Sequence, residues 1–304
     1  MVYLALFAVI NLLVINGGFF FHGSLRPLGS YYFRSKLFRE IQRVLPPKLP
    51  VPLPKDYVEG LDYVRFREQT ALGFGNMYLL GEIHENKGFP GYFFYALLFK
   101  LPLPVIVLFL WALWEYLFGR RRKAFLRDEI FLLIPIAFWL IYFNYFNNSH
   151  IGIRYVLPTI PLIHIFCGSI FAKDFISKRR VWAGALLGVW LIASVLSYFP
   201  HYIPYFNEIV WDRKFAYRYL SDSNIDWGQG RYYARDYLKA HPDIIFEPPI
   251  HTKGKILVGV NALTGVWIFG AKSKREMADR YRWLREGHSP IGHVAYSYLL
   301  FDVP

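Results

Sequence analysis

Five long apolar runs constrain the fold of this chain of 304 residues more than any other feature. A helix that crosses a bilayer needs about 20 predominantly apolar residues, and each run approaches that length. The hydrophobic share of 55% and the charged share of 19% favour the same class of protein. The sequence therefore predicts a polytopic α-helical membrane protein with about five transmembrane helices. The predicted spans are Val2–Phe21, Leu101–Phe118, Ile130–Phe146, Tyr155–Ala172 and Val181–Phe199.

Basic residues are placed in a way that predicts orientation. The formal net charge of +13 suggests nucleic acid at first, but many of the basic residues fill two short connections between predicted spans. Short loops rich in Lys and Arg lie on the cytoplasmic side, so we expect no nucleic-acid partner and a cytoplasmic N-terminus. We expect a multi-pass protein of the cell inner (plasma) membrane. The two clusters are Arg120, Arg121, Arg122, Lys123 and Arg127, and Lys173, Lys178, Arg179 and Arg180.

The same topology divides the chain into two predicted domains. Residues 1–199 form the transmembrane region, with a long outer loop at 23–90, and residues 200–304 form a small extracytoplasmic α/β domain. Hydrophobic periodicity in the second domain predicts two helices and two strands joined by a proline-rich loop at Asp243–Gly254. The predicted helices are Ile225–Ala240 and Ser273–Arg285, and the predicted strands are Lys255–Asn261 and Gly292–Phe301.

One segment of the outer loop has the pattern of an amphipathic helix. Tyr32–Val44 carries apolar residues at helical spacing with basic residues between them. Such a helix lies at a membrane surface or packs on the outer domain of its own protein. Both interpretations are open.

We expect no metal and no cofactor. Cys167 is the only cysteine, so no disulfide within the chain is possible. The nine histidines show no H-E-x-x-H spacing, and no Walker loop or dinucleotide fingerprint occurs.

The stretch Ser221–Gln229 packs two carboxylates, amides and an indole into nine residues. Ser223 and Asp226 have the spacing of a capping box, which predicts a helix start. A structural role for Asp222 and Asp226 therefore competes with contact to a sugar or an acceptor. Trp227 has two interpretations as well, because an indole stacks on a sugar ring or packs in a core.

Several motifs occur in the order found in a known family. Tyr205-Phe206-Asn207-Glu208, followed by Asp222–Gln229, resembles the C-terminal region of bacterial glycosyltransferase family 39 membrane proteins. These proteins are similar to the dolichyl-phosphate-mannose protein mannosyltransferases. Pro52-Leu53-Pro54 and Arg154-Tyr155-Val156-Leu157-Pro158 also fit the pattern. The resemblance implies a GT-C glycosyltransferase that transfers a sugar from a polyprenyl-phosphate-sugar lipid to a glycan, lipid or protein acceptor outside the membrane.

The chain departs from that family in one important respect. Members carry a catalytic carboxylate in their first outer loop, whereas the first outer loop here matches a later loop of the family. The resemblance therefore covers only the C-terminal half, and it assigns no catalytic residue. A separate N-terminal half is an expected partner, and whether this chain alone is an enzyme stays open. The alternative is a non-catalytic membrane scaffold or accessory subunit derived from such an enzyme.

The remaining candidates are substrate-binding residues. Lys100 lies among apolar residues, where it binds a lipid phosphate or extends to the headgroups. Arg154 clamps a phosphate through its planar guanidinium or pairs with an outer carboxylate such as Glu82. His150 is a loop histidine or a substrate ligand. The full set of candidates is Glu82, Lys100, His150, Arg154, Asp222, Asn224, Asp226, Trp227 and Gln229.

Overall fold

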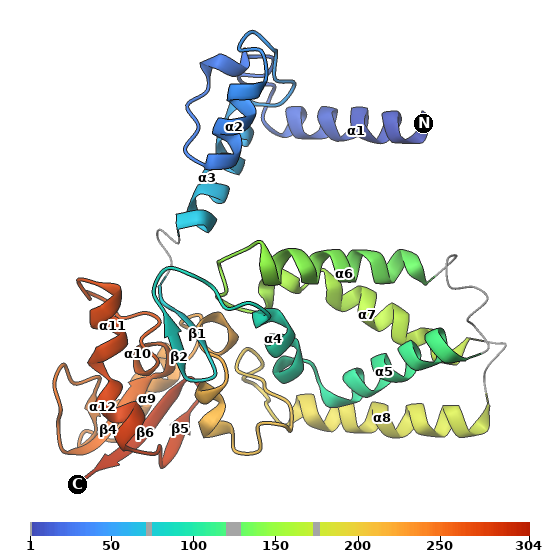
Figure 1. The fold of residues 1–304 in the computed structure, drawn as a ribbon. Coiled ribbons are helices and arrows are strands. Elements are labelled where there is room, and N and C mark those ends of the chain that lie inside the picture. Colours follow the sequence, from blue (N-terminus) through green and yellow to red (C-terminus); the bar gives the residue numbers. More distant parts are fainter. Residues whose placement is uncertain (1, 71–74, 120–128, 173–176) are drawn as a thin grey trace. The chain divides into compact units, whose positions relative to one another are not determined.

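A computed structural model describes residues 2–70, 75–119, 129–172 and 177–304 (Figure 1). It divides into two compact units, Met1–Phe74 and Gly75–Pro304. The boundary falls inside the segment that we expected to form one outer loop. Some of the basic residues that support the predicted orientation lie outside the described residues, namely Arg120–Lys123, Arg127 and Lys173.

The first unit contains three α-helices, α1 (Val2–Gly18), α2 (Lys36–Val44) and α3 (Lys55–Thr70), and a short 3-10 turn at Leu28–Ser30. Its buried cluster consists of Leu28, Tyr31, Phe33 and Val58. Buried Asp62 accepts hydrogen bonds from the backbone N–H groups of Arg34 at 2.7 Å and Ser35 at 2.9 Å. Because Ser35 is the N-cap of α2, this helix begins later than the predicted amphipathic segment.

In the second unit, four of the five predicted apolar runs contain helices, and most of these helices are too short for the predicted topology. They are α5 (Leu103–Phe118), α6 (Ile130–Tyr145), α7 (Thr159–Gly168) and α8 (Lys178–Leu196), and α4 (Tyr92–Lys100) precedes the first of these runs. Of the helices in the described ranges, α8 alone is long and apolar enough to cross a membrane. Helices α4 and α5 pass that test only as a pair, and they are bent by 115° at the break between them. The prediction of a polytopic α-helical membrane protein with about five transmembrane helices is therefore wrong.

The backbone explains why the runs yield short helices. Pro102 lacks a backbone N–H group and is the N-cap of α5, so α4 and α5 do not form one helix. The predicted fourth span starts with a 3-10 turn at Ile153–Val156 after Gly152, whose φ of 151° is in a region that favours glycine. Its α-helical part is limited to the ten residues of α7.

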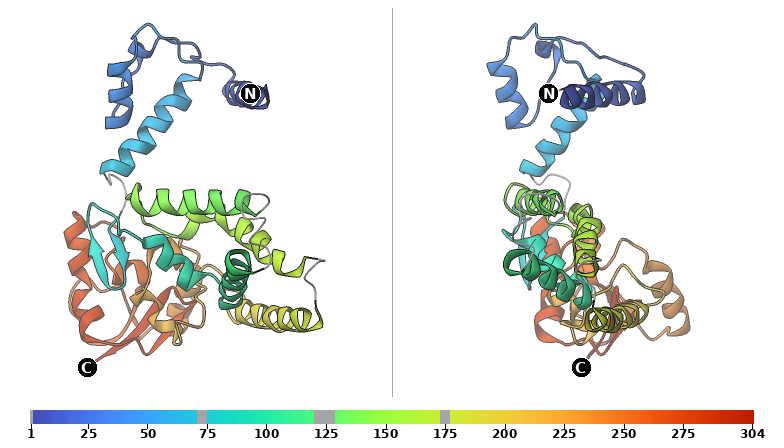
Figure 2. Two further views of the ribbon diagram at one scale, coloured as in Figure 1. Left: turned by 45° about the vertical axis from the view of Figure 1, so that its right-hand side comes forward. Right: turned by 90° about the vertical axis from the view of Figure 1, so that its right-hand side faces the viewer.

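These helices form a bundle around an aromatic cluster. Helix α7 packs against α5 and α6, and α8 packs against α5 (Figure 2). The cluster between α5 and α7 consists of Ala112, Tyr116, Phe166 and Ile170. Arg180 of α8 forms an ion pair with Glu115 of α5 at 2.7 Å, with both side chains about three-quarters buried.

The C-terminal part of the second unit contains a four-stranded sheet in the order β3-β4-β6-β5. Its strands are β3 (Ile245–Phe246), β4 (Gly254–Gly259), β5 (Gly292–Val294) and β6 (Tyr298–Val303). Strand β3 pairs parallel to β4, and the other pairs are antiparallel, with Ile256 opposite Phe301. The single predicted strand Gly292–Phe301 is divided because Ala295 and Tyr296 form a turn with positive φ angles.

Short helices and a hairpin complete this unit. They are β1 (Met77–Leu79), β2 (Glu82–His84), α9 (Arg231–Ala240), α10 (Val260–Leu263), α11 (Lys274–Arg280) and α12 (Arg282–Gly287). Helix α9 begins at Arg231 rather than Ile225, so the predicted capping box is wrong. The Ser223 hydroxyl donates a hydrogen bond to the carbonyl of Ile151 instead of accepting one from Asp226. Gly228, with φ of 89°, breaks the helical path before α9.

Candidate functional site

A pocket of about 600 Å³ opens in the second unit where four segments meet. These segments are the end of α4, the 3-10 turn at Ile153–Val156 with the start of α7, the stretch at 202–205 and the stretch that contains Ser223 and Trp227. The polar and aromatic lining comes from Lys100, Arg154, Tyr202, Tyr205, Ser223 and Trp227, and the aliphatic lining from Ile153, Leu157, Ile160 and Ile203. Three of the candidates from the sequence, Lys100, Arg154 and Trp227, therefore lie in one pocket. We call it the Arg154 pocket.

Arg154 lies over an aromatic surface. Its guanidinium carbon is 4.5 Å from the centre of the Trp227 ring and 5.3 Å from the Tyr155 ring. Within the described parts of the chain, Arg154 forms no ion pair with a carboxylate, so the alternative of pairing with Glu82 is not observed. Stacking on an indole leaves the in-plane N–H groups of the guanidinium directed away from the ring, where they can bind an anion.

Lys100 is the last residue of α4 and crosslinks two loops. Its Nζ donates hydrogen bonds to the carbonyls of Ile203 at 2.8 Å and Asn224 at 2.6 Å. The Nζ also lies 4.8 Å from the centre of the Phe206 ring. Burial lowers the pKa of Lys100 to about 7, because carbonyl oxygens replace water only partly. Lys100 therefore has a structural role in addition to lining the pocket.

Asn224 holds the Arg154 turn in place. Its side-chain oxygen accepts a hydrogen bond from the N–H of Ile153 at 3.0 Å, and its side-chain nitrogen donates to the Tyr92 hydroxyl at 2.7 Å. The same nitrogen donates to the carbonyl of Ser221 at 3.0 Å. Asn224 is fully buried, so it positions the pocket rather than touching a ligand. Sequence reasoning missed Tyr92, because an aromatic residue in an apolar run gives no signal of a polar partner.

Asp222 carries an unusual backbone and an unusual carboxyl group. Its φ of 58° places it in the left-handed region, which Asp tolerates better than most residues. Burial raises the pKa of Asp222 to about 6, while the Ser223 N–H and the positive charge of Arg154 oppose this effect. The carboxyl group of Asp222 is thus poised to exchange a proton near neutral pH.

The other acidic and amide candidates shape the turn after Asp222. Burial raises the pKa of Asp226, whose carboxylate accepts a hydrogen bond from the Gly228 N–H at 2.9 Å. The side chain of Gln229 bonds to the backbone of Trp227 and Ile225. Glu82 is exposed on β2 and does not line the Arg154 pocket.

His150 lies inside the protein rather than in the pocket. Its Nδ1 accepts a hydrogen bond from the Phe89 N–H at 2.7 Å, and its Nε2 lies 3.1 Å from the carbonyl of Phe143. Its ring stacks on Tyr92 with a centroid distance of 5.1 Å. Burial lowers the pKa of His150 to about 4, so the ring is neutral at pH 7 and its contacts are structural.

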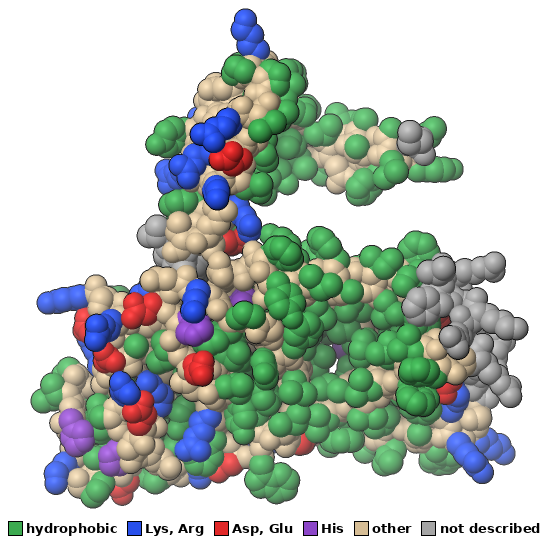
Figure 3. Space-filling view, in the orientation of Figure 1, with side chains coloured by type: hydrophobic (Ala, Val, Ile, Leu, Met, Phe, Trp, Pro, Cys, Tyr) green, Lys and Arg blue, Asp and Glu red, His purple; other side chains and the backbone are tan. Residues whose placement is uncertain are grey.

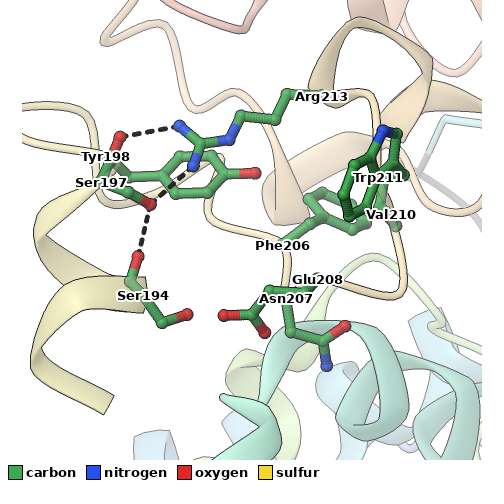
Figure 4. Close-up of a pocket in the computed structure, with 9 residues that line it drawn as sticks. All are labelled: Ser194, Ser197, Tyr198, Phe206, Asn207, Glu208, Val210, Trp211 and Arg213. Atoms are coloured by element: carbon green, nitrogen blue, oxygen red, sulfur yellow. Dashed lines mark hydrogen bonds between the residues drawn. The ribbon is translucent and has the colours of Figure 1, made fainter. Parts of the chain in front are cut away.

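A second pocket of about 170 Å³ lies beside the end of α8 (Figure 4). Arg213 reaches across it and donates hydrogen bonds to the carbonyl of Ser197 at 2.7 Å and to its hydroxyl at 2.6 Å. The guanidinium also bonds to the Tyr296 hydroxyl and lies 4.0 Å from the centre of the Tyr198 ring. Because Arg213 already has these partners, it fastens α8 to the sheet, and the Arg154 pocket is the stronger candidate for a ligand.

No metal centre is evident in the described ranges, where no group of three or more His, Cys, Asp or Glu side chains is placed to hold an ion. Comparisons with protein-family models, with curated proteins and with solved structures found no match to the chain.

Proposed function

We propose that this chain is the C-terminal half of a membrane-associated glycosyltransferase that takes its sugar from a polyprenyl-phosphate donor. The observation that carries the proposal is the position of Arg154, whose guanidinium lies over Trp227 at 4.5 Å. It forms no direct ion pair in the described residues, and the carboxyl group that its charge affects is that of Asp222. A cation that lines a partly apolar pocket favours a phosphate ligand, because charge-assisted hydrogen bonds to an oxyanion are strong.

The rest of the lining supports an amphiphilic ligand. Leu157, Ile160 and Ile203 offer aliphatic contacts that suit a polyprenyl chain, while Trp227 is 57% exposed and offers a flat surface to a sugar ring. The phosphate would lie between these two parts, beside Arg154. In its protonated form Lys100 would contribute positive potential, and the N–H that neither carbonyl accepts would serve as a further donor.

Exposed apolar helices support a location at a membrane. Only 6% of the most apolar 18-residue stretch of α8 is buried, and Trp182, Leu186 and Ile192 are all at least 60% exposed. Hydrophobic side chains also gather over the helical part of the second unit (Figure 3). Apolar surfaces of this kind need a lipid or protein environment.

Asp222 is the first residue to test as a catalytic base. A base that accepts a proton from an acceptor hydroxyl works best when its pKa is close to the working pH, and burial raises the pKa of Asp222 to about 6. A non-catalytic accessory subunit is the second candidate function, because Asp222 is not among the residues that line the Arg154 pocket. In that role the pocket would hold the lipid for a separate catalytic half.

Both candidate functions require the Arg154 pocket to bind a polyprenyl phosphate, and native mass spectrometry tests this by measuring how much lipid the protein retains. The parent in detergent micelles should retain a polyprenyl phosphate, Arg154→Ala should lose most of it, and Arg154→Lys should retain an intermediate amount. Arg275→Ala is the matched control, because Arg275 is 85% exposed on α11. Equal retention by the parent and both Arg154 variants would contradict the proposed phosphate site.

A further inference from the structure

A groove of about 800 Å³ runs along α9, next to the Arg154 pocket. It is lined by Arg231, Tyr232, Arg235 and Lys239 of α9, by Tyr298 of β6 and by Phe246 of β3. Trp227 lines the Arg154 pocket, and the next residue, Gly228, lines this groove. The two cavities therefore both reach the chain at Trp227 and Gly228, and we call the second the α9 groove.

The charges of the α9 groove are unbalanced. Arg231, Arg235 and Lys239 follow one another at a spacing of four residues, so they share one face of the helix with a rise of about 6 Å between neighbours. Asp236 is the one carboxylate that pairs with them in the described ranges, at 3.5 Å from Arg235 and 3.2 Å from Lys239. Arg231 forms no ion pair in the part of the chain that the structure describes. The residues that line the groove thus include three cations and no carboxylate, although burial raises the pKa of Tyr298 and the nearby carboxylates of Asp226 and Glu247 raise it further.

Aromatic rings accompany these cations. Tyr232 and Phe246 are 66% and 46% exposed, and the guanidinium carbon of Arg235 lies 5.2 Å from the centre of the Tyr232 ring. The Tyr298 ring fills the space between two glycines, since a Cβ at Gly230 or at Gly259 would lie 3.2 Å or 3.3 Å from it. The Phe246 and Tyr298 rings are 6.1 Å apart. No described group forms a hydrogen bond with the Tyr298 hydroxyl.

We propose that the α9 groove binds an anionic saccharide as the acceptor of the sugar. The cations suit the carboxylate or phosphate groups of such a ligand, and the aromatic rings suit the apolar faces of its sugar rings. The volume falls in the usual range of ligand sites, about 300–1,000 Å³. The acceptor role rests on the proposed glycosyltransferase function, because only the neighbouring donor pocket makes this groove part of a transfer site.

Isothermal titration of the full chain tests the groove. Trigalacturonate is the carboxylate probe, mannose 6-phosphate is the phosphate probe, and maltotriose is the neutral control. The parent should bind at least one anionic probe and should bind maltotriose much more weakly. Whichever anionic probe binds identifies the charged group that the site prefers. Failure of the parent to bind either anionic probe, or equal binding of maltotriose, would overturn the proposal.

Paired variants locate the binding. Arg231→Gln with Arg235→Gln should weaken anionic-probe binding about tenfold, the effect of removing two exposed charged contacts. Arg275→Gln with Arg282→Gln removes the same charge from exposed ion pairs on α11 and α12 and should leave binding within about twofold. Equal loss in both double variants would overturn the groove as the site. Tighter binding of a single-stranded oligothymidylate than of either saccharide would overturn the saccharide as its ligand.

The Arg154→Ala variant separates the two sites. It should lose polyprenyl phosphate while binding the anionic saccharide as the parent does. If Arg154→Ala retains the lipid while Arg231→Gln with Arg235→Gln still loses saccharide binding, the donor pocket is refuted and the α9 groove is not. Loss of saccharide binding in Arg154→Ala would refute the α9 groove as an independent site.

Discussion

Replacing Asn224 with alanine should destabilise the second unit strongly. The Asn224 side chain makes three hydrogen bonds in a fully buried position, to Ile153, Tyr92 and Ser221. Each contributes about 1 kcal/mol net, and the stranded Ile153 N–H adds a desolvation cost of about 1–3 kcal/mol. We therefore expect a loss of about 4–6 kcal/mol in the free energy of unfolding.

The assay is chemical unfolding of the full chain in detergent micelles, followed by near-UV circular dichroism. Asn86→Ala is the matched control, because exposed Asn86 makes one long hydrogen bond, of 3.3 Å, with Lys274. The free energy of unfolding of Asn86→Ala should differ from that of the parent by less than about 0.5 kcal/mol. If Asn224→Ala unfolds at the same denaturant concentration as Asn86→Ala, Asn224 does not hold the Arg154 turn, and our description of the site is wrong.

Two further predictions concern neighbouring residues. Because burial raises the pKa of Asp222 to about 6, its contribution to stability is greatest below about pH 4 and is lost as the pH rises to about 6. Above pH 6, Asp222→Asn should therefore be more stable than the parent by about 1–3 kcal/mol, and this difference should shrink toward pH 4. The measurement is chemical unfolding of both proteins at pH 4, 6 and 8, and a stability difference that does not change with pH would contradict the prediction. Gly152→Ala should destabilise by at least about 2 kcal/mol, because the φ of Gly152 is 151° and a Cβ there would collide with the Ser223 hydroxyl. A thermal unfolding curve that matches that of Gly188→Ala, where no atom lies within 4 Å of the added Cβ, would refute this prediction.

The apolar runs located the helices but not their ends. Hydrophobic composition marks a segment as buried or lipid-facing, whereas helix length depends on local backbone geometry at Pro102 and Gly152. The capping box failed for a similar reason. Ser223 has the right spacing from Asp226, but it bonds to Ile151, which is distant in the sequence. Contacts of this kind are set by tertiary structure and leave no local pattern.

The candidate site was partly accessible from the sequence. Charged residues at the ends of apolar runs are costly without a role, and this argument pointed to Lys100 and Arg154. The chain folds so that both line one pocket with Trp227. The buried positions of His150 and Asn224 were not predictable, because a loop histidine and a loop asparagine look alike whether they face solvent or the core.

The most direct test of the central claim changes the ligand rather than the protein. Native mass spectrometry should compare retention of a polyprenyl phosphate with that of the polyprenol of equal chain length, in the parent and in Arg154→Ala. The proposed site predicts that the parent strongly prefers the phosphate and that Arg154→Ala shows little preference, since a charge-assisted bond of about 1.5–3 kcal/mol corresponds to a preference of about tenfold or more. Equal retention of the two lipids by the parent would contradict the claim that Arg154 binds a lipid phosphate.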